Sequence, residues 1–227
     1  MSDVNQKNNE SNKSCRFFTP YKGEFYGTEK SILSKKMLIV GASHYCSNFY
    51  ECGNNCGNIP KDKKCAEFTF GVIDTFFSSN ERPRWMRTYS AFANSVLGYD
   101  ATLEDQCKFF QSVVFVNYLQ RAEGEKGNEK HNSWFRNVQN ADAFKQTITE
   151  YTPDVIVVWG ARVWPALPWR DFIIDEAQST GNVKKCSYQG KSFILMQVHH
   201  PSMGYVREIH LKLFREYEIF IIDPNNK

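Results

Sequence analysis

The sequence lacks any long hydrophobic run, and none approaches the roughly 18 apolar residues that a membrane-spanning helix needs. The first residues, Met1 to Ser14, contain no apolar core, which excludes an ordinary secretory signal and predicts a disordered leader. The formal net charge is only +3, so charge alone does not establish a polyanionic partner. We therefore expect a cytoplasmic, intracellular protein that does not engage a membrane.

Length and composition favour one domain. The chain has 227 residues, of which 41% are hydrophobic and 15% aromatic, enough for a substantial core. We expect a disordered N-terminal arm over residues 1–20, a single α/β domain over 21–227, and a monomer. Residues 46–65, rich in Asn, Gly, Lys and Cys, have the composition of an insertion within that domain.

Four short apolar runs, largely β-branched, end abruptly in small or polar residues. They lie in 38–45, 113–119, 155–160 and 194–202. Strands covered on both faces read as continuous apolar runs, and ligands bind just beyond their carboxyl ends. The residues that follow the runs should therefore converge on one rim: Gly41 to Tyr45, Asn117, Trp159-Gly160 and His200 to Ser202.

The segments between these runs have helical spacing, which predicts a three-layer α/β/α sandwich around a mainly parallel, four-stranded sheet. Thr102 and Asp105 form a potential capping box. We expect helices over 83–97, 141–151 and 205–219, a short helix after Thr102, a hairpin over 184–198 and a long loop over 121–134.

The order and content of the four runs resemble the uracil-DNA glycosylase superfamily. Its members carry a Gly-x-Asp-Pro-Tyr-like loop after the first strand, then strands ending in Asn, in Trp-Gly and in His-Pro-Ser. Matching residues here are Gly41 and Tyr45, Asn117, Trp159-Gly160, and His200-Pro201-Ser202. The resemblance covers residues 37–205. It implies a glycosylase-like fold and a protein that flips a uracil-like or deaminated base out of DNA and hydrolyses its N-glycosidic bond.

Asn117 and His200 carry the expected chemistry. A side-chain amide offers one acceptor and two donors to the edge of a base, although Asn117 can also satisfy backbone groups at a strand end. A neutral His200 can donate a hydrogen bond to the carbonyl oxygen on which charge accumulates, contributing on the order of 3 kcal/mol. The alternative is a buried structural histidine, and His199 is the competing neighbour.

The resemblance implies further contacts around the base. Tyr45 would form the pocket wall that rejects the methyl group of thymine, Phe68 would stack on the flipped base, and Met203 would wedge into the vacated position. Phe68 and Met203 also fit as core residues. The expected substrate-binding residues are Gly41, Ala42, Tyr45, Asn117, Phe68 and Ser202, and the expected DNA-binding residues are Pro201 and Met203.

The first loop departs from the family pattern. Ser43 stands where the best-known members have an Asp that activates water, and His44 replaces the Pro. A serine hydroxyl can orient water but supplies no negative charge. We expect Ser43, His44 and His200 to be the catalytic residues, with uracil excision in question. Catalytic, metal-ligating and neutral roles stay open for His44.

Four of the seven cysteines fall in a C-x5-C-x3-C-x8-C pattern: Cys46, Cys52, Cys56 and Cys65. Four thiolates suffice for tetrahedral zinc, and we expect a structural zinc site that supports the first loop. An iron–sulfur cluster is the second interpretation, since some relatives carry one, and an absence of metal is the third.

The leading hypothesis is a DNA-base glycosylase. A second is a nucleic-acid-binding relative that has lost hydrolysis because Ser43 replaces the loop Asp. A third is a serine hydrolase with Ser43 as nucleophile, His200 as base and Asn117 as oxyanion donor. That interpretation lacks an orienting carboxylate three residues before the histidine, where Gln197 stands.

Overall fold

A mixed, mostly parallel sheet lies at the centre of the protein. The computed structural model describes residues 16–46, 56, 63–124 and 132–219. Four parallel strands form the middle of the sheet in the order β4 (Val113–Asn117), β2 (Met37–Gly41), β6 (Val155–Trp159) and β9 (Lys191–Val198). The register sets Gly41 opposite Asn117 and Trp159 opposite Val198. The carboxyl ends of the four predicted apolar runs therefore lie side by side along one rim of the sheet.

Helices cover both faces of the sheet, and β2, β4 and β6 are therefore buried along their whole length. Alternate side chains of each strand point to opposite faces. Ile39, Phe115 and Val157 join one core cluster with residues of α3 (Phe68–Ser78), α4 (Met86–Leu97), α5 (Leu103–Gln111) and α7 (Arg207–Glu216). The intervening residues join a second cluster with residues of α6 (Val138–Tyr151).

The predicted helices are confirmed, with shifted ends. α4 begins three residues later than expected, after a turn in which the Met86 N–H bonds to the Pro83 carbonyl, and it ends at Gly98 with φ 82°. The capping box of Thr102 and Asp105 is present at the start of α5. α6 begins earlier than expected because the Asn137 side chain caps the Gln139 N–H.

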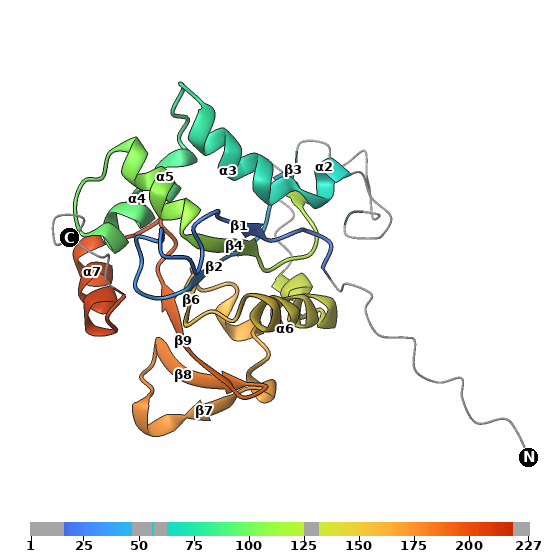
Figure 1. Cartoon of the computed structure of the whole chain (residues 1–227). Coiled ribbons are helices and arrows are strands. Elements are labelled where there is room, and N and C mark those ends of the chain that lie inside the picture. The colour runs from blue at the N-terminus through green and yellow to red at the C-terminus, as the bar shows by residue number, and fades with distance from the viewer. Residues whose placement is uncertain (1–15, 47–55, 57–62, 125–131, 220–227) are drawn as a thin grey trace, which may run out of the picture.

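Among the described residues, seven strands form the sheet, where four were expected. β1 (Tyr21–Lys22) pairs antiparallel with β4 at one edge. At the other edge the predicted hairpin adds β8 (Val183–Tyr188) to β9, and β7 (Ile173–Asp175) adds to β8. Figure 1 shows α3, α4 and α5 gathered at one end of the molecule and β7, β8 and β9 at the opposite end. The mainly parallel character therefore holds only for the inner strands.

A second, two-stranded sheet replaces part of the expected long loop. β5 (Glu123–Gly124) pairs in parallel with β3 (Tyr45–Cys46). Residues 125–131 lie outside the described part, and the chain resumes in the 3-10 turn η2 (Asn132–Arg136). The remaining short elements are α2 (Lys63–Ala66), η3 (Trp164–Ala166), η4 (Trp169–Asp171) and η5 (Glu176–Gln178).

Packing of the domain begins at residue 16, within the expected N-terminal arm. Phe17 and Phe18 are buried, and their N–H groups donate to the Gln120 side-chain oxygen at 2.7 and 3.2 Å. Residues 1–15 lie outside the described part.

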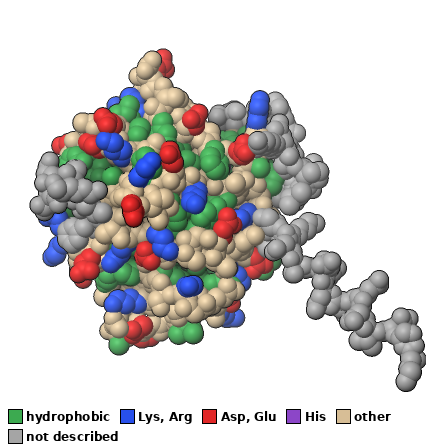
Figure 2. Space-filling model, viewed as in Figure 1, with side chains coloured by type: hydrophobic (Ala, Val, Ile, Leu, Met, Phe, Trp, Pro, Cys, Tyr) green, Lys and Arg blue, Asp and Glu red, His purple; other side chains and the backbone are tan. Residues whose placement is uncertain are grey.

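The surface drawn in Figure 2 mixes basic and acidic side chains, in keeping with the small net charge. Among the helices that the structure describes, none combines the length and apolar character required to cross a bilayer.

The capping box generates a stability prediction. Replacing Thr102 by Ala removes the oxygen that accepts the Asp105 N–H, so we expect a loss of about 1 kcal/mol in the free energy of unfolding. Urea denaturation measures this loss. Thr102→Ser keeps the hydroxyl and should stay close to the wild type; an equal loss in both variants would contradict the capping role.

Candidate functional site

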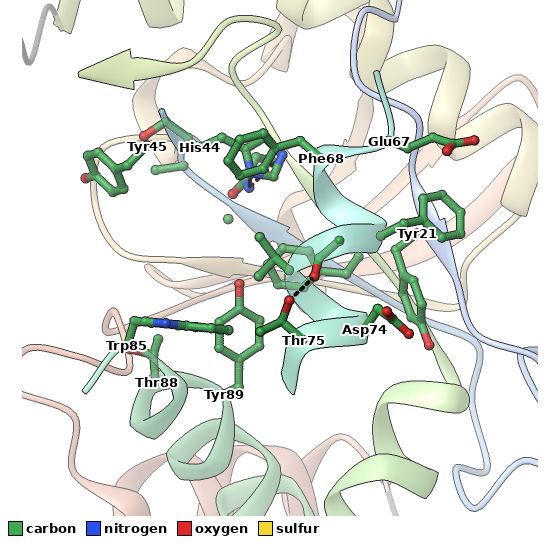
Figure 3. Close-up of a pocket in the computed structure, with 18 of the residues that line it drawn as sticks. Tyr21, His44, Tyr45, Glu67, Phe68, Asp74, Thr75, Trp85, Thr88 and Tyr89 are labelled. Atoms are coloured by element: carbon green, nitrogen blue, oxygen red, sulfur yellow. Dashed lines mark hydrogen bonds between the residues drawn. The ribbon is translucent and has the colours of Figure 1, made fainter. Parts of the chain in front are cut away.

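A cavity of about 1020 Å³ opens where β2, β4 and β6 end. Ligand sites commonly measure about 300–1000 Å³, so its volume is at the upper end of that range. The cavity is lined by residues of the first loop, by Asn117, Trp159 and His200, and by residues of α3 and α4. Figure 3 shows α3 running along it, with Trp85, Thr88 and Tyr89 on one side and His44, Tyr45 and Phe68 on the other.

Gly41 and Asn117 pack closely against each other at the ends of β2 and β4. A Cβ added to Gly41 would lie 2.2 Å from the Asn117 side-chain oxygen, far inside van der Waals contact. Only glycine therefore allows the amide to occupy this position beside the neighbouring strand. Asn117 is 8% exposed, and its side chain is among those that line the cavity.

His44 fixes the orientation of that amide. The Asn117 nitrogen lies 3.1 Å from His44 Nδ1 and 3.3 Å from Nε2, and Nε2 lies 3.0 Å from the Thr69 hydroxyl. A consistent assignment has Asn117 donating to Nδ1 while the proton on Nε2 is donated to Thr69. Complete burial lowers the pKa of His44 to about 3, so the ring is neutral at physiological pH. This geometry favours a positioning role for His44.

His200 is another residue that lines the cavity. Its Nδ1 accepts from the Ser202 backbone N–H at 3.3 Å and lies 2.7 Å from the Ser202 hydroxyl. These contacts place the ring proton on Nε2. Burial lowers the pKa of His200, which favours the neutral ring. Gly160, at φ 79°, leaves room for it, because an added Cβ would lie 3.3 Å from the His200 Cβ.

The competing histidine has other neighbours. His199 is exposed, and its ring lies 5.5 Å from that of His210 on α7. Its side chain is not among those that line the cavity. The structure therefore brings His200, and not His199, to the site.

Ser43 contacts a carboxylate that the sequence did not suggest. Its hydroxyl donates to Glu123 Oε2 on β5, and Glu123 is 1% exposed. The two terminal guanidinium nitrogens of Arg162 donate to the same carboxylate, at 2.8 and 3.1 Å. In the described part of the chain, the hydrogen bonds of Ser43 and His200 lead to Glu123 and to Ser202 respectively, so no Ser43–His200 dyad of a serine hydrolase is formed.

Tyr45 and Phe68 line the cavity but differ in position. Tyr45 is 47% exposed, and in Figure 3 its ring extends away from His44 and Phe68. Phe68 packs against the His44 ring with centroids 4.6 Å apart. Tyr45 therefore lies at the rim of the cavity. Phe68 forms part of its wall, where its ring packs at a tilt against the His44 ring.

The His-Pro-Ser segment continues into an exposed turn. Pro201 is buried, Ser202 bonds to His200, and Met203 is 76% exposed. The Met203 N–H bonds to the His200 carbonyl at 2.9 Å, which closes the turn. Met203 is therefore not a core residue under α7.

Ala42, which was predicted to bind substrate, also lines the cavity.

Three of the four cysteines in the predicted metal pattern contact the same apolar cluster. Cys46, Cys56 and Cys65 pack against an apolar cluster of Phe17, Phe18 and Ala122, and the Ala122 N–H lies 3.2 Å from Cys56 Sγ. Cys52 lies outside the described residues. Within the described ranges, no three side chains among His, Cys, Asp and Glu are grouped to hold a metal ion.

The side of the cavity formed by α3 and α4 was not predicted from the sequence. Trp85 and Tyr89 share a helical stripe with core residues, so the stripe alone indicated burial. Trp85 is 39% exposed, and the Tyr89 hydroxyl points into the space between α3, α4 and the first loop in Figure 3. The Trp159 indole nitrogen is buried without a hydrogen-bond partner in the described structure. In the sequence, only the position of Arg162 just after a strand end could have indicated the ion pair with Glu123.

The neutral state of His44 generates a pH prediction. Folding lowers its pKa below the unfolded value, so the stability present above about pH 6.5 is lost as the pH falls toward 3. Between pH 7 and pH 5, we expect His44 to account for about 2 kcal/mol of lost stability. Urea denaturation at both pH values, comparing wild type with His44→Gln, measures the difference; parallel pH profiles would contradict it.

No protein-family model matches this sequence, and a search of curated proteins gives no significant match.

Proposed function

We propose that this protein is a DNA-base glycosylase, with a three-layer sandwich of the uracil-DNA glycosylase kind. The observation that carries the proposal is that Asn117 and a neutral His200 line one aromatic-walled cavity at the carboxyl ends of parallel strands. To hydrolyse an N-glycosidic bond in DNA, a protein must hold the base outside the helix stack and recognise its edge. It must also donate a hydrogen bond to the base as the base leaves with negative charge.

Asn117 recognises the edge of the base. One amide N–H bonds to His44, which leaves the second N–H and the oxygen as potential ligand contacts. The Gly41 contact and the His44 hydrogen bond hold the amide in one orientation before the base arrives. A fixed amide discriminates between bases better than a rotating one, because it cannot exchange its donor and acceptor to match a different base edge.

His200 stabilises the departing base. A neutral imidazole with its proton on Nε2 donates to a carbonyl oxygen as negative charge develops there, and the partly buried site strengthens this interaction. Met203, exposed on the following turn, is placed to enter the stack of the DNA and occupy the vacated position.

A binding protein without hydrolytic activity is the second candidate. It is favoured by the identity of Ser43, since this hydroxyl and not a carboxylate faces the cavity from the first loop. The two candidates share the same DNA contacts and differ only in whether the base is released.

We also propose that the cysteine-rich segment binds zinc beside the first loop. Backbone N–H to sulfur contacts such as Ala122 to Cys56 stabilise a thiolate, the form that binds zinc. Cys46 directly follows the loop and pairs in β3, so an ion held there would restrain Tyr45. The iron–sulfur interpretation uses the same ligands.

Release of bases from labelled oligonucleotides tests the proposed function. The panel contains uracil, hypoxanthine, xanthine and oxidised bases in single and double strands. We expect wild type to release one class of base, and His200→Ala to lower kcat about 100- to 1000-fold, as removal of a single donor does in other enzymes. Asn117→Ala should abolish the choice between bases.

His199→Ala is the matched control, because this neighbouring histidine is exposed and lies outside the cavity. It should release base at the wild-type rate. Binding of the panel without release of any base would favour the second candidate, and equal losses in the two histidine variants would contradict the assignment of His200.

Metal analysis of the purified protein tests the zinc proposal. We expect about one zinc per chain, lost in Cys56→Ser and retained in Cys107→Ser, since Cys107 lies on α5 away from the cluster. Iron in place of zinc would favour the cluster, and an absence of both metals after anaerobic purification would refute the site.

A further inference from the structure

A partly exposed Arg162 and a buried Glu123 form an ion pair next to the first loop. Glu123 is 1% exposed, and both its oxygens bind Arg162. The backbone fixes the carboxylate in place, since the Glu123 N–H donates to the His44 carbonyl at 2.7 Å and β5 pairs with β3. Breaking such a pair leaves an uncompensated buried charge, so it persists only in a well-determined geometry.

The carboxylate determines what Ser43 offers to the cavity. A serine hydroxyl has one proton and two lone pairs, and here the proton is donated to Glu123. Ser43 also lines the cavity, whereas Glu123 does not. The oxygen therefore faces a ligand only as an acceptor. Because Arg162 compensates the charge of Glu123, the carboxylate acts through this hydrogen bond more than through its field.

We propose that Glu123 is a positioning residue that turns Ser43 into an acceptor for the attacking water, a role that rests on the proposed glycosylase function. The water oxygen forms a bond to the sugar C1′, and the bond from C1′ to the base nitrogen breaks with its electron pair leaving on the base. Ser43 accepts a hydrogen bond from the water during attack. The proton that the water loses reaches the departed base through solvent, so Ser43 and Glu123 end unchanged.

The same network ties the loop to the mouth of the cavity. Hydrogen bonding to Glu123 raises the pKa of Arg162, and the Tyr45 side chain adds a smaller contribution. Arg162 also lies over the Phe135 ring, 4.7 Å from its centroid. Ser43, in the middle of the loop, and Tyr45, at its end, thus both interact with one guanidinium–carboxylate unit.

Binding to abasic DNA analogues tests this role independently of base release. One oligonucleotide carries a neutral tetrahydrofuran site, and the other carries a cationic 1-azasugar, which resembles the positively charged sugar of the transition state. An oxygen that presents only lone pairs favours the cation, so wild type should bind the azasugar DNA about tenfold more tightly. Ser43→Ala and Glu123→Gln should each bring the ratio close to one.

The double variant decides whether Glu123 acts through Ser43. If it does, Ser43→Ala with Glu123→Gln has the same ratio as Ser43→Ala alone. Thermal denaturation shows whether Glu123→Gln folds. If it does not, Ser43→Ala, which removes only a hydroxyl, still tests whether the Ser43 oxygen produces the preference for the azasugar DNA. Glu104→Gln, which alters an exposed ion pair on α5, is the control and should keep the wild-type ratio.

The outcomes separate the two proposals. A wild-type ratio near one, or no binding of either DNA, overturns the role of Glu123, as does a Glu123→Gln protein that is folded and keeps the preference. A tenfold preference without release of any base supports the acceptor role of Ser43 and refutes the proposed hydrolysis.

Discussion

The register of β2 against β4 is the constraint on which the site depends. It sets Gly41 directly opposite Asn117, and the absence of a Cβ at Gly41 lets the amide lie against the neighbouring backbone. A shift of β4 by one residue would turn the Asn117 side chain to the other face of the sheet. Because both faces of these strands are packed, such a shift would interchange the side chains of the two core clusters and disrupt their packing, so the hydrophobic core itself holds the amide in position.

Buried polar groups around this contact form a connected set with assigned partners. Asn117 bonds to His44, His44 to Thr69, and Glu123 to Arg162 and Ser43. A buried polar atom left without a partner costs about 1–3 kcal/mol, so each member of such a set restrains the next. Hydrogen bonds consequently link the first loop to two elements: His44 bonds to Thr69 on α3, and Ser43 bonds to Glu123 on β5.

Much of the rim was predictable from the sequence, and the reason is geometric. The carboxyl ends of parallel strands meet at one edge, so residues after separate apolar runs become neighbours. Asn117, His200 and the residues from Gly41 to Tyr45 line the cavity for this reason. Glu123 was not predictable, because the polar stretch around it has no periodicity, and its pairing with β3 depends on where the first loop lies.

The sequence by itself determined the α/β class, the four inner strands with the polar residues that follow them, and most helices. These features follow from local periodicity and from caps such as Thr102. Only the tertiary structure decided three matters. It extended the sheet to seven strands, placed His200 and not His199 in the cavity, and brought a carboxylate to Ser43. Each depends on contacts between segments far apart in the chain, whose relative positions no local pattern of residues specifies.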